Sequence, residues 1–163
     1  MSDSRKEDFL TWLRDAHALE EQAEQLFEGQ AARYADYPNI QVSLSAEINH
    51  SKHFQKLLAE KINLLGGSTS IVKDTVGKLV ASAQIVMGMA AADEPVKGVL
   101  ALHTFTQFEI GSFKILKAAA SAEIQDEILL LSESIITHLE ARAAWLEQEL
   151  DHVTRKYLLR KAA

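Results

Sequence analysis

Cysteine is absent from this chain of 163 residues, and glycine and proline are scarce, with 7 and 2 copies. Without cysteine the chain can form neither disulfides nor thiolate metal sites, which excludes zinc-finger and thioredoxin-like proteins. No apolar run approaches the length needed to cross a bilayer. The polar N-terminal segment, residues 1–8, lacks the apolar core of a secretory signal. We therefore expect a cytoplasmic protein that does not contact a membrane.

An excess of positive charge is also lacking. The chain has 17 Lys and Arg residues against 23 Asp and Glu residues, a formal net charge of -6. Broad nucleic-acid binding needs a basic face, so we expect no nucleic-acid partner. The sequence also contains neither a Gly-x-Ser-x-Gly elbow nor a glycine-rich phosphate loop, which argues against serine hydrolases and nucleotide-binding proteins.

The abundant residues are Ala, Leu, Glu, Lys and Gln, which are strong helix formers. Apolar residues recur at three- and four-residue steps and predict long helices over residues 4–34, 39–65, 93–120 and 125–159. Gly66-Gly67 ends the second of these helices, and residues 70–92 are interpreted as a crossover with one or two short helices. Two helical hairpins joined by a long crossover are typical of a ferritin-like four-helix bundle. We predict one all-α domain of this type over residues 1–163.

One ligand-type residue interrupts the apolar stripe of each long helix. These residues are Glu20, Glu47, Glu109 and His138. The fourth stripe reads Ile124, Ile128, Leu131, Ile135, His138, Arg142 and Trp145, and it then drifts toward Leu146, Leu150 and Val153. A buried carboxylate is costly unless it is paired or coordinated. The four interruptions therefore indicate a polar site inside the bundle.

The spacing of the second helix points to a metal site. Glu47 and His50 form a Glu-x-x-His pair, about 60° apart around the helix. In di-iron carboxylate bundles two helices give one Glu each, and the other two give Glu-x-x-His each. Carboxylate and imidazole ligands suit iron or manganese, with zinc as a substitute. We predict a metal site held by Glu20, Glu47, His50, Glu109 and His138, and we assign no catalytic residue.

The distances along the chain predict the level of each ligand in the bundle. Glu109 and His138 lie nearly equally far from the turn near Glu123, so we expect them at one level. Glu20 lies further from its turn than Glu47 does, so we expect these two acids to be offset along the bundle.

Three short segments resemble a known family. They are residues 13–20 (LRDAHALE), residues 64–67 (LLGG) and residues 108–113 (FEIGSF). In their order and spacing they are similar to the YciF/YciE-like family (DUF892) of ferritin-like bacterial stress proteins. The resemblance extends over nearly the whole chain. It implies a ferritin-like bundle with a role in stress, and it places the five predicted ligands where the family has metal-ligand-type residues.

The fourth helix departs from the pattern that this resemblance implies. A second acid is expected about one turn before His138, where this chain has Ser134 and Ile135. The pair Glu149-x-x-His152 has the right spacing but lies about three turns further on, too far along the helix to share the site. One ligand of the six-ligand set is therefore missing, which argues against a full dinuclear site. A mononuclear, an asymmetric and a vestigial site all stay open.

Two functions follow from these features. The first is a metal-binding bundle protein, whose chemistry, if it is an enzyme, would be oxidation of Fe(II) or handling of oxygen or peroxide. The second is a non-catalytic structural or stress protein, in which Arg142 neutralises Glu109 or Glu20 and forms a buried Arg–Glu–His network without metal. In both, Trp12 and Trp145 are interpreted as core or dimer-interface residues, and we expect a homodimer.

Overall fold

The computed structural model describes residues 3–70 and 95–161. Helix α1 spans Asp3–Ala31 and continues into a short 3-10 helix, η1 (Ala32–Tyr34). It is followed by α2 (Pro38–Leu64), α4 (Pro95–Ala122) and α5 (Asp126–Lys161). The predicted all-α class is confirmed, and the predicted helix ends lie within a few residues of the observed ones. The crossover prediction and the predicted helix start at residues 93–94 lie outside the described residues, except for Ser70.

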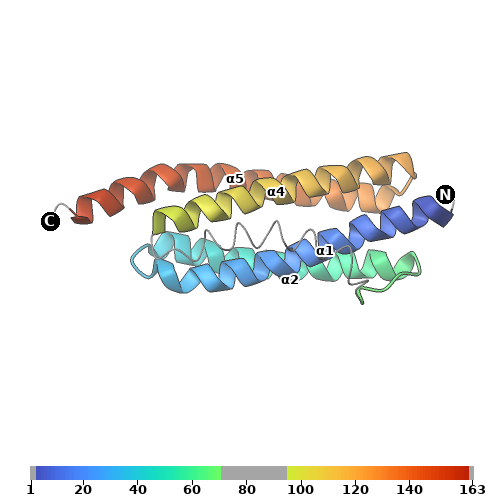
Figure 1. Ribbon diagram of the computed structural model, residues 1–163, viewed down its shortest axis with the longest axis horizontal. Coiled ribbons are helices and arrows are strands. Elements are labelled where there is room, and N and C mark those ends of the chain that lie inside the picture. The colour runs from blue at the N-terminus through green and yellow to red at the C-terminus, as the bar shows by residue number, and fades with distance from the viewer. Residues whose placement is uncertain (1–2, 71–94, 162–163) are drawn as a thin grey trace.

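The four long helices form two hairpins that lie along each other (Figure 1). Helix α1 packs against α2, α4 packs against α5, and α1 also packs against α4. The backbones of α2 and α5 approach each other at few points. Side chains must therefore span the α2–α5 side of the bundle, and this side is where the polar site lies.

The two helix ends at one end of the bundle have the same hydrogen-bond geometry. Gly66 has a φ of 78°, and the amides of Gly66 and Gly67 donate to the carbonyls of Asn63 and Ile62 at 2.9 Å. This Schellman geometry confirms the predicted glycine stop of α2. Ile124 takes the equivalent place after α4 with a φ of 55°, and Gln125 donates to the carbonyl of Ala120 at 2.8 Å.

The stripe predicted for the fourth helix is wrong at its first residue. Ile124 is 81% exposed because it lies in the turn before α5 and not in the helix. The rest of the stripe agrees in part: Ile128, Ile135, Arg142, Leu146 and Val153 are buried, whereas Leu131, His138, Trp145 and Leu150 are partly buried.

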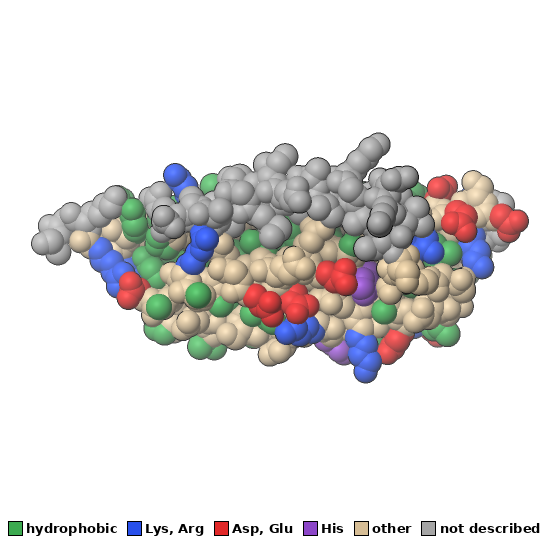
Figure 2. Space-filling model, turned by 60° about the horizontal axis from the view of Figure 1, so that its bottom comes forward, with side chains coloured by type: hydrophobic (Ala, Val, Ile, Leu, Met, Phe, Trp, Pro, Cys, Tyr) green, Lys and Arg blue, Asp and Glu red, His purple; other side chains and the backbone are tan. Residues whose placement is uncertain are grey.

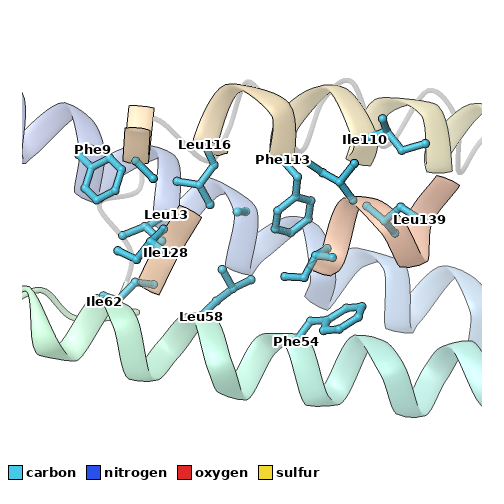
Figure 3. Packing of buried hydrophobic residues seen from close by; sticks show 14 of the residues in the cluster. Phe9, Leu13, Phe54, Leu58, Ile62, Ile110, Phe113, Leu116, Ile128 and Leu139 are labelled. Atoms are coloured by element: carbon cyan, nitrogen blue, oxygen red, sulfur yellow. The ribbon is translucent and has the colours of Figure 1, made fainter. Parts of the chain in front are cut away.

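The apolar core consists of two clusters at opposite halves of the bundle. The first cluster takes residues from all four long helices, and Figure 3 shows them pointing toward one another; the ones labelled there are Phe9, Leu13, Phe54, Leu58, Ile62, Ile110, Phe113, Leu116, Ile128 and Leu139. The second cluster includes Leu19, Phe27, Leu44, Leu102, Phe105 and Leu146. Neither cluster contains Glu20, Glu47, Glu109 or Arg142, which are also buried. A polar layer therefore divides the core near its middle.

The surface carries charges of both signs. On the face drawn in Figure 2, basic side chains lie among acidic ones and do not gather into a single patch. Within the described ranges, none of the helices has an apolar stretch long enough to traverse a bilayer.

Candidate metal centre

Every long helix contributes to the polar layer between the two apolar clusters. Glu20 comes from α1, Glu47 and Ser51 from α2, Thr106 and Glu109 from α4, and Arg142 from α5. All of these residues are at most 9% exposed, and Glu20 and Glu109 are fully buried. The residues replace apolar ones on the inward helix faces, so folding carries their polar groups out of water.

Arg142 lies at the centre of the layer. Its Nη1 donates to Glu47 Oε2 at 3.1 Å, its Nη2 donates to Glu109 Oε2, and its Nε donates to Thr106 Oγ1 at 3.1 Å. Thr106 can accept this bond because its own hydroxyl donates to the carbonyl of Leu102 at 2.9 Å. The guanidinium carbon also lies 4.7 Å from the centroid of the Phe27 ring, a cation–π distance. Arg142 therefore connects α5 with the other three long helices.

Two acids in this layer keep unpartnered oxygens. Both carboxylate oxygens of Glu20, and Oε1 of Glu109, are buried without a hydrogen-bond partner. Burial raises the pKa of Glu20 to about 7, although the charge of Arg142 opposes the rise. Burial also raises the pKa of Glu109 well above its usual value. The charge of Arg142 opposes this rise, whereas the negative charges of Glu20 and Glu47 add to it. Inside the layer the charged form of both side chains is therefore disfavoured.

Glu47 behaves in the opposite way. Burial disfavours its charge, but the hydrogen bond from His138 and the charge of Arg142 together hold the pKa of Glu47 below its usual value. His138 Nε2 lies 2.9 Å from Glu47 Oε2, the oxygen that Arg142 also contacts. Glu47 is therefore the ionised carboxylate that joins the buried layer to the histidines.

His50 and His138 lie next to Glu47 on the outer side of the layer. Their rings are 4.2 Å apart between centroids, and the ligand atoms of Glu47, His50 and His138 all lie within 4.8 Å of one another. His50 is exposed and His138 is partly buried. Burial and the neighbouring His138 lower the pKa of His50, which favours the neutral imidazole that a metal ion requires.

A surface hollow of about 260 Å³ opens onto this group between α2 and α5. Glu47, His138 and Arg142 line it, together with Ser43, Ala46, Ala141 and Trp145. The hollow follows from the separation of the α2 and α5 backbones, which leaves the site open to solvent on this side. A small ion or molecule can therefore reach Glu47 and His138 from solvent.

The structure divides the five predicted ligands into two groups. Glu47, His50 and His138 are together on the outer side, whereas Glu20 and Glu109 lie deeper and contact Arg142 by charge or hydrogen bond. Among the described residues, only the outer three are close enough to one another to form a compact ligand group. The assignment of all five as ligands of one metal site stays a prediction.

The predicted offset of the first hairpin is confirmed. Gln55 donates to the backbone carbonyl of Glu20 at 3.2 Å, and Ser51 faces the Glu20 side chain. Glu20 is therefore level with Ser51 and Gln55, which lie further along α2 than Glu47.

The departure in the fourth helix is visible in the structure. Ser134 is exposed, and Ile135 is fully buried in the first apolar cluster, so neither can supply the missing acid. Glu149 and His152 pair with each other at 3.0 Å, and the His152 side chain is 54% exposed, so this pair stays outside the polar layer.

Thr106 is the residue of the layer that sequence reasoning missed. It lies three residues before Glu109 and is fully buried, but a threonine is a common helix residue and carries no ligand signal of its own. Its role follows from Arg142, whose Nε needs an acceptor inside the bundle. The only available signal was its position one helical turn before Glu109, the acid that interrupts the apolar stripe, on the same helix face.

Comparison with known proteins identifies the family. A family model described as a domain of unknown function, DUF892, matches residues 4–159. The chain therefore belongs to this family, as the resemblance of its short motifs indicated.

Two solved structures are similar to this one. A protein from Xanthomonas campestris pv. campestris shares 25% identity and a TM-score of 0.83, with 98% of this chain and 99% of that chain covered. A ferritin-like, diiron-carboxylate protein from Bacillus anthracis shares 19% identity and a TM-score of 0.75, with 92% and 99% covered. The second likeness shows that the fold is ferritin-like.

Proposed function

We propose that this DUF892 protein is a ferritin-like metal-binding protein that holds one iron or manganese ion per chain at Glu47, His50 and His138. The observation that carries the proposal is the compact group of one carboxylate and two imidazoles, contributed by α2 and α5. A role in the bacterial stress response, a homodimeric state and a cytoplasmic location stay predictions.

The donor atoms suit such an ion. Two neutral imidazoles and one carboxylate form a ligand set that takes divalent iron, manganese or zinc and leaves other coordination positions open. When bound, iron or manganese supplies one-electron chemistry toward oxygen or peroxide. The low pKa of Glu47 keeps its carboxylate available as a ligand at neutral pH. Arg142 donates a hydrogen bond to that carboxylate from inside the bundle and fixes its position.

Equilibrium dialysis tests this proposal. Protein freed of metal with a chelator is dialysed against Mn²⁺, and bound metal is measured by elemental analysis. We expect about one ion per chain in the wild type and a loss of affinity of at least about 100-fold in His50→Ala, because removing a ligand costs more than the 10–100-fold typical of an outer-shell change. His50 is exposed, so the variant should fold normally.

His53→Ala is the matched control. His53 lies one turn further along α2, is also exposed, and its ring lies 6.1 Å from the Phe54 ring, so its loss removes a nearby imidazole that is not one of the three ligands. Mn²⁺ binding that is weak and equal in the wild type, His50→Ala and His53→Ala would refute the proposed site.

A second function is favoured by Arg142. Its contacts with Glu47 and Glu109 give the layer a permanent positive charge, so the bundle has a built-in partner for its acids. The protein would then be a non-catalytic helical structural or stress protein with a metal-free polar core. In that case the free energy of unfolding would not change when Mn²⁺ is added, whereas an ion that binds only the folded chain would raise it.

A further inference from the structure

We infer that Arg142 occupies the place of a second divalent cation, and that its removal opens a latent ion site formed by Glu20 and Glu109. The inference rests in part on the proposed function, because the first ion is the one assigned to Glu47, His50 and His138. It concerns a different set of residues, however. It predicts a difference in the number of bound ions between the wild type and a variant, and not the metal content of the wild type alone.

The position of the guanidinium is the first argument. Arg142 contacts Glu47 and Glu109 through two different nitrogens and is 3% exposed, so its charge lies between carboxylates of α2 and α4. Phe27 from α1 covers the guanidinium on another side. A cation bound between these helices would need the space that the guanidinium fills.

The unpartnered oxygens are the second argument. Glu20 Oε1, Glu20 Oε2 and Glu109 Oε1 are buried and accept no hydrogen bond. A buried acceptor without a donor costs free energy, and most buried polar groups in proteins have a partner. Arg142 has used its contacts on Glu47, Glu109 and Thr106, so it leaves these three oxygens unsatisfied. They are oxygen ligands of the type that iron and manganese accept.

The sequence position of Arg142 is the third argument. It follows His138 by four residues, so both side chains lie on the same face of α5. This helix contributes a histidine and a cation to that face. The acid at the same level, Glu140, is exposed and pairs with Lys114 instead. An arginine at this position, beside His138 on the inward face, excludes an ion.

The test compares Mn²⁺ stoichiometry in the full chain and in Arg142→Gln. Gln keeps a polar side chain of similar reach but removes the positive charge and the bulk of the guanidinium. We expect Arg142→Gln to bind one more Mn²⁺ per chain than the wild type. The added ion should also give the electron paramagnetic resonance signal of two coupled Mn²⁺ ions, which a merely structural role of Arg142 would not produce.

Three further variants locate the effect. Arg142→Lys keeps a positive charge in the layer and should bind as many ions as the wild type. Arg155→Gln removes an exposed arginine that pairs with Asp151 on the same helix, and it should also leave the count unchanged. Glu109→Gln combined with Arg142→Gln removes an acid of the latent site and should return the count to the wild-type value.

The outcomes separate this inference from the proposed function. A wild type that binds no Mn²⁺ contradicts the proposed function, while an extra ion in Arg142→Gln still supports the role of Arg142. Equal counts in the wild type and Arg142→Gln overturn the inference, whatever the wild type binds. If metal-free Arg142→Gln does not fold, Mn²⁺ should restore its helical circular dichroism signal, and a chain that stays unfolded with Mn²⁺ overturns the inference as well.

Discussion

Replacing Glu20 with Gln should make the metal-free protein more stable at alkaline pH and leave it nearly unchanged in acid. Glu20 is fully buried, and neither of its side-chain oxygens accepts a hydrogen bond. Its pKa rises from 4.5 to about 7, because burial disfavours the charged form more than Arg142 stabilises it. Glutamine has nearly the same shape and does not titrate, so the variant removes the charge and little else.

The magnitude follows from the rise in pKa. A group whose pKa is raised in the folded state holds its proton longer than in the unfolded chain, so folding is favoured below the unfolded value. This contribution is lost as the pH rises from 4.5 to about 7. A pKa difference of one corresponds to about 1.4 kcal/mol, so the lost free energy of folding amounts to about 3 kcal/mol. Glu20→Gln should therefore gain about 3 kcal/mol over the wild type between about pH 4 and about pH 8.

Urea denaturation followed by far-ultraviolet circular dichroism measures this gain. Both proteins are kept in chelator, and the free energy of unfolding is compared at the two pH values. Glu147→Gln is the matched control, because Glu147 is exposed on α5 and its charge should matter little at either pH. A difference between Glu20→Gln and the wild type that is the same at both pH values would mean that Glu20 titrates normally, and it would refute the reasoning.

Three further substitutions test the packing, the turn and the polar layer by urea denaturation. Phe113→Ala removes a fully buried ring from the first apolar cluster and should cost about 3–5 kcal/mol, whereas Ile115→Ala, at a 57% exposed position of the same helix, should cost far less. Ile124→Gly should stabilise the protein by about 1 kcal/mol, because glycine adopts the positive φ of this position without the steric penalty of an L side chain; a loss of stability would contradict this. Arg142→Met in chelator should cost about 3–5 kcal/mol, because the buried acids lose their positive partner, and a neutral result would show that the layer does not depend on this charge.

Much of the fold could be predicted from the chain alone, because its signals are local. The apolar stripes mark the helices, and Gly66 marks the end of α2, since a positive φ favours glycine there. The same reasoning failed at Ile124, where local backbone hydrogen bonds of the turn accompany a positive φ that a branched residue rarely adopts. A stripe pattern cannot distinguish the last residue of a turn from the first residue of a helix.

The site was less accessible to such reasoning. The acids and histidines could be recognised because they interrupt the apolar stripes of the helices. The offset of Glu20 along the bundle followed from its distance to the turn. The depth of each side chain was not visible, because depth depends on how far apart the helices pack. The structure shows His50 at the surface and Glu109 at the centre, although both lie on or beside the apolar stripes of their helices.

The four long helices and the polar residues turned toward their common axis follow from the chain alone, because helical periodicity assigns each residue to a face. Which of these residues meet depends on how the helices pack. The packing brings Glu47, His50 and His138 together where α2 and α5 stand apart, and it places Arg142 between Glu47 and Glu109. The physical reason is that contacts between helices depend on their spacing and relative level, and these are set by the packing of the two apolar clusters on either side of the polar layer.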